Sequence, residues 1–97
     1  MATMLAPDEL DEVIDPLDFT ATDVTGLRML DFEGVDGHRF ASDVAMSVAS
    51  QMELPTSASK YSLRDDERAR MLLDDRPLGR QVQRGAKLVV IPKAHLG

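Results

Sequence analysis

Four consecutive aliphatic residues, Leu88–Ile91, constrain the fold more than any other stretch of the sequence. Three of the four are β-branched, and β-branched side chains favour the pleated, half-buried surface of a sheet. Gly85 precedes them and suits a turn into a strand, whereas Pro92 follows them and cannot donate a hydrogen bond to a sheet ladder. We therefore expect the last strand of the fold over Leu88–Ile91.

The alternation of side chains along a strand gives these four residues two different roles. Leu88 and Val90 should face the core, and Val89 and Ile91 should face away from it. An outward aliphatic pair on a sheet is either ordinary surface hydrophobicity or a patch that binds a partner. Val89 and Ile91 are therefore candidate partner-binding residues.

The length and composition of the chain bound what it can be. With 97 residues it forms one small domain, and with 43% hydrophobic but only 4% aromatic residues its core must be aliphatic. It has no cysteine, which excludes a disulfide scaffold, a thiolate metal site and a nucleophilic cysteine. No apolar run approaches the ~20 residues of a membrane span, and no basic segment precedes an apolar one at the N-terminus. We expect a cytoplasmic protein without a membrane partner.

The net charge of −6 is distributed unevenly. Residues 1–36 carry ten acidic residues and one basic residue, which gives −9, whereas residues 37–97 carry seven acidic and ten basic residues, which gives +3. Nucleic-acid binding is disfavoured by the total, because contacts to phosphates need an excess of positive charge. The uneven distribution could instead orient a protein partner or draw the acidic part of the chain to its basic part.

Residues 1–15 are interpreted as an acidic arm. Pro7 followed by acidic residues suits the first turn of a short helix. An aliphatic stripe with helical spacing follows, formed by Leu10, Val13, Ile14 and Leu17. A helix this short is not stable alone in water. The arm is therefore either a disordered tail or a motif that docks through this stripe on another copy of the chain or on a partner.

The next segment predicts a β-hairpin. Leu17–Thr22 alternates between apolar and polar residues, Leu27–Phe32 does so approximately, and the Thr25-Gly26 pair between them is a turn signal. An alternative hairpin would pair Leu27–Glu33 with Arg39–Ala41. Its second strand would be unusually short, so the first pairing is preferred.

Residues 42–54 predict the single helix of the chain. Ser42 is a suitable N-cap, and Val44, Val48 and Met52 form one apolar row. Pro55 marks the end of the helix. With one apolar face, the helix should lie on one sheet.

Two further short strands should follow the helix, Tyr61–Asp65 and Arg70–Leu73, joined by a charged turn. Leu78 and Val82 in the next connection should insert into the core. The core should also receive four methionine side chains, those of Met29, Met46, Met52 and Met71.

The resulting order, strand–strand–helix–strand–strand–strand, resembles the ubiquitin-like β-grasp, an α+β fold with one helix packed across a mixed sheet. Leu54-Pro55 after the helix, Arg76-Pro77-Leu78 and Val82-Gln83 resemble ubiquitin motifs, and Gly85–Gly97 matches its last strand and tail in length. Bacterial members from ubiquitin-like conjugation operons are more similar, and so are relatives in type VII secretion; the similarity lies in three segments, Tyr61–Asp65, Leu73–Gly79 and Gly85–Leu88. By this resemblance, the β-grasp domain covers residues 16–91, between the arm and a tail of residues 92–97.

This resemblance implies a protein modifier. A partner adenylating enzyme would activate the carboxylate of Gly97 with ATP, and a conjugating enzyme with a reactive cysteine would transfer it to a target or to another copy. A metalloprotease could reverse the bond. The tail residues recognised by these enzymes would be Pro92, Lys93, Ala94, His95 and Leu96. Related alternatives are a non-covalent adaptor that binds through Val89 and Ile91, a sulfur carrier, and a self-assembling subunit.

The chain itself is not expected to be an enzyme. It has no Gly-rich phosphate loop followed by Lys-Ser/Thr and no Ser-His-Asp spacing, and its only histidines are His38 and His95. Two histidines do not make a zinc site without distant carboxylates, and the later acidic pairs lack the spacing of a calcium loop. We expect no catalytic residue, metal or cofactor in this chain, so that any ATP is used by the partner.

Overall fold

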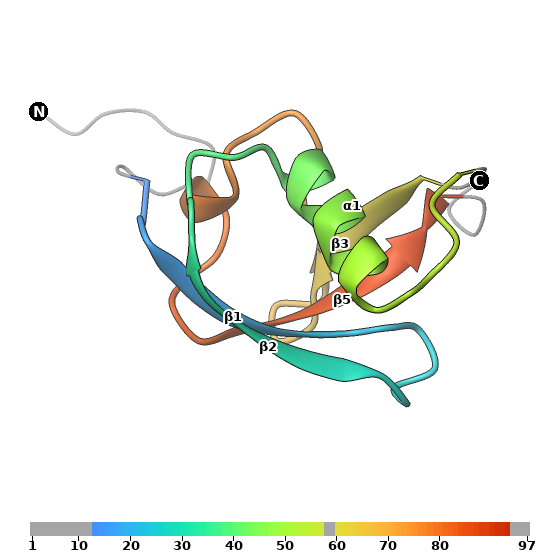
Figure 1. The fold of residues 1–97 in the computed structure, drawn as a ribbon. Coiled ribbons are helices and arrows are strands. Elements are labelled where there is room, and N and C mark those ends of the chain that lie inside the picture. The colour runs from blue at the N-terminus through green and yellow to red at the C-terminus, as the bar shows by residue number, and fades with distance from the viewer. Residues whose placement is uncertain (1–12, 58–59, 94–97) are drawn as a thin grey trace, which may run out of the picture.

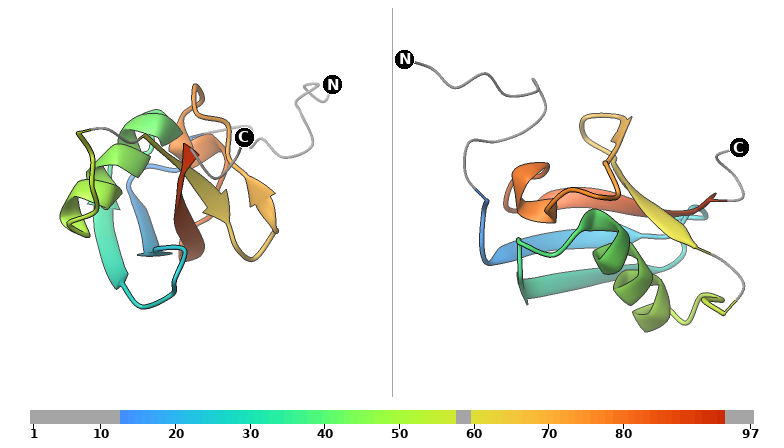
Figure 2. Two further views of the ribbon diagram at one scale, coloured as in Figure 1. Left: turned by 90° about the vertical axis from the view of Figure 1, so that its right-hand side faces the viewer. Right: turned by 90° about the horizontal axis from the view of Figure 1, so that it is seen from above.

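The computed structural model describes residues 13–57 and 60–93 of the chain. These residues form a mixed five-stranded sheet with one helix on one of its faces, as Figures 1 and 2 show. The elements are β1 (Leu17–Thr22), β2 (Met29–Val35), α1 (Ala41–Gln51), β3 (Tyr61–Asp65), β4 (Arg70–Met71), a short 3-10 helix (Leu78–Arg80) and β5 (Ala86–Pro92). The predicted α+β class, with one helix and a mixed sheet, is confirmed.

Strand β5 lies at the centre of the sheet, whose strand order is β2-β1-β5-β3-β4. It runs parallel to β1 and antiparallel to β3. Leu88 and Val90 are 1% and 0% exposed, so the predicted phase of this strand is confirmed. The strand is longer than predicted, because it includes Ala86 and Pro92; Pro92 forms its last pair with Tyr61, a terminal position that a sheet tolerates for proline.

The predicted hairpin is present, with β1 and β2 antiparallel, and the alternative pairing with residues 39–41 does not form. Gly26 adopts a positive φ of 74° in the turn. Strand β2 begins later than predicted, because the Thr25 hydroxyl and the Asp23 carboxylate accept hydrogen bonds from the main chain of Leu27 and Arg28 and keep these residues in the turn. The strand also ends later, at Val35.

The helix is shorter than predicted, and its first turn is capped differently. No side chain caps it, and Phe40 rather than Ser42 occupies the N-cap position. The N–H groups of Ala41 and Ser42 donate instead to the carbonyl oxygens of Arg76 and Asp74, which lie in the loop after β4. At the other end, the Arg28 guanidinium donates to the Met52 carbonyl oxygen at 2.6 Å, which ties the β1–β2 hairpin to the helix C-terminus.

The core lies between α1 and the sheet and is mainly aliphatic, as predicted, but it also contains the aromatic residues Phe19 and Tyr61. Leu78 and Val82 are both fully buried, which confirms their predicted place. Two of the four methionines predicted in the core are exposed, however: Met29 (65%) and Met71 (37%). Each occupies an outward position of an edge strand, opposite Thr22 and Arg64 respectively.

Strand β4 ends at Met71 rather than at Leu73. The buried Gln81 side chain binds both main-chain groups of Leu73: its Oε1 accepts from the N–H at 2.7 Å, and its Nε2 donates to the carbonyl oxygen at 2.9 Å. These groups are therefore not available to a longer strand. Among the described residues, no helix is both long and apolar enough to cross a membrane.

Candidate interaction surfaces

The first candidate surface is the sheet face opposite the helix, called here the open sheet face. Val89 pairs with Thr22 of β1 on one side and Arg64 of β3 on the other, and Ile91 pairs with Ser62. Both aliphatic side chains are half-buried rather than fully exposed. Val89 has a neighbouring strand on both sides, whereas Ile91 lies beyond the end of the β1 pairing and is flanked by β3 alone.

A hollow of about 320 Å³ lies on this face beside Val89. The hollow brings together one strand-edge methionine, Met29, and three charged side chains, those of Asp31, Asp66 and Lys87. The Arg64 guanidinium forms an ion pair with Asp66 at 2.9 Å, and the Thr20 hydroxyl donates to Asp31 at 2.8 Å. The face therefore combines an apolar floor with a charged rim, a composition typical of protein interfaces.

The predicted tail begins within the sheet. Pro92 is the last residue of β5, and the N–H of Lys93 donates to the carbonyl oxygen of Lys60 at 2.8 Å. The Lys93 ammonium also forms an ion pair with Asp74 at 2.8 Å. These contacts attach Pro92 and Lys93 to the folded domain. The other predicted tail residues, Ala94, His95, Leu96 and Gly97, lie outside the described residues.

The predicted docking stripe of the arm does not form one helical face. Leu17 is 0% exposed in β1 and belongs to the core, so it has no surface with which to dock. Val13 and Ile14 are not helical, because the main chain of Ile14 is tied to the domain by a hydrogen bond from its N–H to the Gly79 carbonyl oxygen. Leu10 lies outside the described residues. Residues 13–15 are thus attached to the domain that was predicted to start at residue 16.

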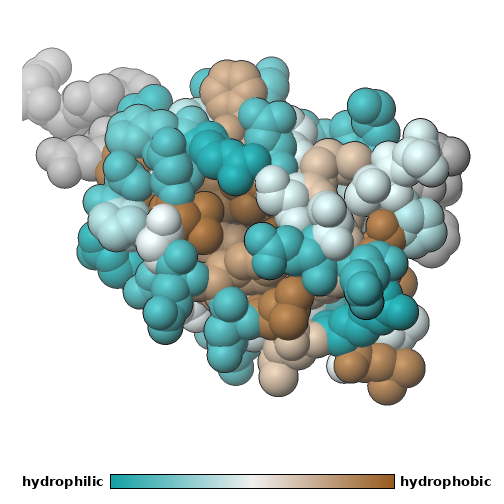
Figure 3. Space-filling view, in the orientation of Figure 1, coloured by the Kyte–Doolittle hydropathy of each residue, from teal (hydrophilic) through white to brown (hydrophobic). Residues whose placement is uncertain are grey.

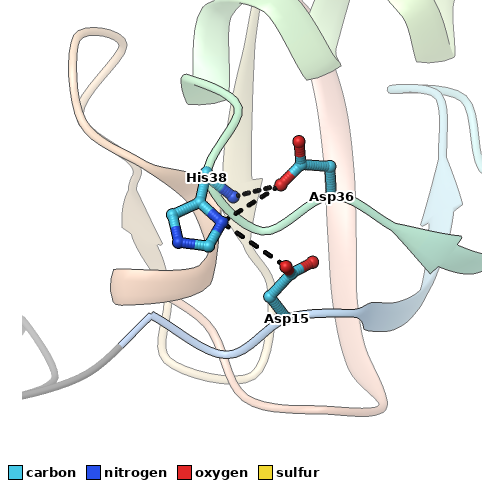
Figure 4. Close-up of side chains that lie close together, drawn as sticks. All are labelled: Asp15, Asp36 and His38. Carbon is cyan, nitrogen blue, oxygen red and sulfur yellow. Dashed lines mark hydrogen bonds and ion pairs between the residues drawn. The ribbon is translucent and has the colours of Figure 1, made fainter.

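A cluster of Asp15, Asp36 and His38 fastens this segment to the loop before α1 (Figure 4). His38 Nδ1 lies 3.4 Å from one Asp15 oxygen and 3.3 Å from one Asp36 oxygen. The other Asp15 oxygen accepts from the N–H of Gly37 at 3.1 Å. Sequence reasoning missed the cluster, because Asp15 lies far from the other two residues in the chain.

Contacts within this cluster lower the pKa of Asp36 and give both carboxylates partners in the protein. The main-chain N–H of His38 donates a hydrogen bond to Asp36, and this bond is the main cause of the lowered pKa of the Asp36 carboxyl. Slight burial acts in the opposite direction and raises the pKa. The His38 ring and the positive charge of Arg39 lower the pKa further. One potential metal-ligand atom from each of the three side chains lies within 4.8 Å of the others, so a cation could bridge them. All three side chains are exposed, however, and already contact other groups of the protein. We assign them a structural role.

A second candidate surface is the outer edge of β2. Within the described residues, β2 pairs only with β1, so its other edge carries no strand. Beside its first residues lies an open groove of about 370 Å³, lined by Leu27 and Met29 from the hairpin and by Met52 and Glu53 from the end of the helix. Sequence patterning predicted neither the free edge of β2 nor the groove beside it, because which strand lies at an edge depends on long-range pairing.

Comparison with known proteins assigns no role to these surfaces. No family model matches the chain. No curated protein is significantly similar to it in sequence.

Proposed function

We propose that the chain is a ubiquitin-like protein of the β-grasp fold, which a partner adenylating enzyme activates at Gly97 and a conjugating enzyme transfers to a target. The observation that carries the proposal is the arrangement around β5. This strand lies parallel to β1 at the centre of a mixed sheet, with one helix on one face, and its carboxyl end leads directly to the last residues.

The anchoring of Lys93 supports a threading role for the residues after it. Its main chain is held by Lys60 and its ammonium by Asp74. Four further residues reach roughly 13–14 Å when extended, at about 3.3–3.6 Å per residue. A segment of this length can pass through a narrow channel while the folded domain stays outside. Glycine at its end suits such a channel, because it has no side chain.

The proposed chemistry takes place on the partner enzymes. The Gly97 carboxylate attacks the α-phosphate of ATP, which forms an acyl-adenylate and releases pyrophosphate. A cysteine thiolate of the partner then displaces AMP to form a thioester, and a target amine displaces the thiolate to form an isopeptide bond. The proposal requires a free carboxylate at Gly97, either encoded or produced by processing. It places the protein in the cytoplasm, where ATP is available.

ATP–pyrophosphate exchange with the cognate activating enzyme tests the first step. The chain ending at Gly97 should support exchange, whereas the same chain without Gly97 should not, at an unchanged thermal midpoint. A Lys60→Ala variant is a matched control, because it alters a side chain near the anchor without changing the end. Equal exchange with and without Gly97 would contradict the proposal.

A non-covalent adaptor is the second candidate function, favoured by the hollow beside Val89 on the open sheet face. In this case the chain should support no pyrophosphate exchange, and Val89→Lys should weaken partner binding. Exchange that depends on Gly97 would instead favour the modifier.

A further inference from the structure

Strand β2 is a seven-residue edge strand without proline or lysine, two residues that commonly protect such edges, and its bulge lies in its last part, between Phe32 and Val35. Its unpaired main-chain groups are satisfied by water or by another extended strand. An added strand would place its side chains alternately against the two faces of β2. The two faces differ in chemistry, so they specify what kind of strand fits.

One face of β2 is acidic. Asp31 and Glu33 are exposed on it, and a shallow hollow of about 200 Å³ joins them to Asp18 of β1. Lysine and arginine are absent from the lining of this hollow. The Asp31 and Asp18 carboxylates accept hydrogen bonds from Thr20 and from the Gly34 N–H, whereas the described contacts hold no partner for the Glu33 side chain. A strand laid against this face would gain from cationic side chains opposite the acids.

The other face of β2 is apolar and incompletely covered. Leu30 and Phe32 pack against the core but remain half-buried, because the helix lies over β3 and β5 rather than over β2. In Figure 3, hydrophobic surface shows between the helix and β2. The groove beside Leu27 and Met29 continues this surface toward the end of the helix. Aliphatic side chains of an added strand would complete this edge of the core.

We propose that the β2 edge binds an extended segment of a partner protein in which basic and aliphatic residues alternate. The basic residues lie opposite Asp31 and Glu33, and the aliphatic residues cover Leu30 and Phe32. Charge complementarity selects this occupant over a second β2: pairing two β2 strands edge to edge would bring four carboxylates onto one face and cost stability by like-charge repulsion. None of these residues belongs to the tail of residues 92–97, so this inference stands independently of the proposed modifier function.

The test uses the full chain and a short peptide in which lysine and valine alternate. A peptide of the same composition, with its lysines and valines in separate blocks, is the control for charge alone, and an alternating glutamate–valine peptide reverses the charge. We expect the alternating basic peptide to bind, measured by fluorescence anisotropy. It should also protect β2 amide protons from exchange, measured by NMR. The blocked peptide should bind at least about tenfold more weakly, and the acidic peptide should not bind.

Two double variants locate the site. Asp31→Lys/Glu33→Lys should weaken binding about tenfold or more, because two attractive cross-strand pairs become repulsive. Glu67→Lys/Asp75→Lys makes the same charge change at exposed positions away from β2 and should leave binding within about twofold. Circular dichroism verifies that each variant is folded.

Several outcomes would overturn the inference. Equal binding of the alternating and blocked peptides would reduce it to non-specific charge attraction. Equal weakening of binding by both double variants would also indicate non-specific charge attraction. Protection of amide protons in β4 rather than in β2 would show that the peptide binds the opposite edge of the sheet. Protection of β2 that grows with protein concentration in the absence of peptide would show that a second copy is the occupant.

Discussion

The main-chain N–H of Ile14 donates a hydrogen bond of 2.9 Å to the carbonyl oxygen of Gly79. The N–H of Gly79 in turn donates to the Gly37 carbonyl oxygen at 2.8 Å. Residues 13–15 therefore lie directly over two glycines from distant parts of the chain. A Cβ added at Gly79 would collide with the Ile14 carbonyl oxygen and lie 2.7 Å from a methyl group of Val13, so only glycine leaves room for this segment.

We predict that Gly79→Ala releases residues 13–15 and destabilises the domain by about 1–3 kcal/mol, the usual cost of overpacking. Urea denaturation measures the loss, and faster exchange of the Ile14 amide proton shows its origin. Ser50→Ala, at an exposed position of the helix, is a control that should change stability little. A Gly79→Ala variant with an unchanged Ile14 amide would show that the segment is not held by this contact.

The phase of β5 gives a second prediction. Leu88→Ala should cost about 2–4 kcal/mol, because it leaves a cavity in the core. Val89→Ala should cost only about 1 kcal/mol, since Val89 is half-buried on the opposite face. Thermal or urea unfolding of the two variants compares them directly. A larger loss for Val89→Ala would mean that the strand is turned the other way.

Local patterns in the sequence were sufficient for most of the fold. The apolar row of Val44, Val48 and Met52 predicted the helix face, and the alternation in Leu88–Ile91 predicted which side chains are buried. The Thr25-Gly26 pair predicted the hairpin turn. In each of these cases, the determining interactions lie within a few residues of one another, so a local pattern carries the information.

The failures share a long-range cause. Leu17 continues the helical spacing of the arm, but pairing with Val35 and burial in the core decide its place in β1. Ser42 is a good cap by residue type, but the Asp74 carbonyl oxygen takes its N–H. The Asp15–His38 contact likewise depends on where the chain folds back. The outward phase of Val89 and Ile91 could be predicted from local alternation, but the free edge of β2 required the strand order, which no local pattern contains.

A third prediction concerns the buried amide of Gln81, which both accepts from and donates to the main chain of Leu73. Gln81→Leu should cost about 1–3 kcal/mol, because it leaves these main-chain groups without their partner. Gln81→Glu keeps the acceptor and loses the donor, so an ionised carboxylate would face the Leu73 and Arg76 carbonyl oxygens.

The Gln81→Glu variant distinguishes an electrostatic effect from a packing defect, because only the electrostatic effect depends on pH. Burial and the facing carbonyl oxygens should raise the pKa of the new carboxyl above its ordinary value, so its protonated form is favoured in the folded state. The destabilisation should therefore shrink as the pH is lowered toward 4–5, a range of about one unit around the ordinary glutamate pKa. Urea denaturation at several pH values measures this. Gln81→Leu is the matched control, because its loss of stability should not depend on pH.

The last prediction concerns acid stability and Asp23 in the β1–β2 turn. Burial acts to raise the pKa of this carboxyl, but the hydroxyl of Thr25 and main-chain N–H groups of the turn outweigh burial and lower it below the ordinary value of 3.8. A carboxyl with a lowered folded pKa contributes stability above its unfolded pKa, and this contribution is lost as the pH falls through the folded pKa. The contribution of Asp23 should therefore be complete near neutral pH, begin to fall near the ordinary aspartate pKa of about 4, and be lost once the pH lies below the lowered folded pKa.

Asp23→Asn tests this dependence. The variant should be less stable than the parent near neutral pH, and the difference should shrink as the pH falls below about 4, because the parent carboxyl becomes protonated as the pH passes through its lowered pKa. Urea denaturation across this range measures both curves, and Asp75→Asn, in an exposed loop, is the control for the loss of one carboxylate. Because Asp23 positions the turn that carries Arg28, amide exchange in residues 26–28 should also increase in Asp23→Asn near neutral pH. A difference in stability that stays constant with pH would show that the variant acts through packing rather than through charge.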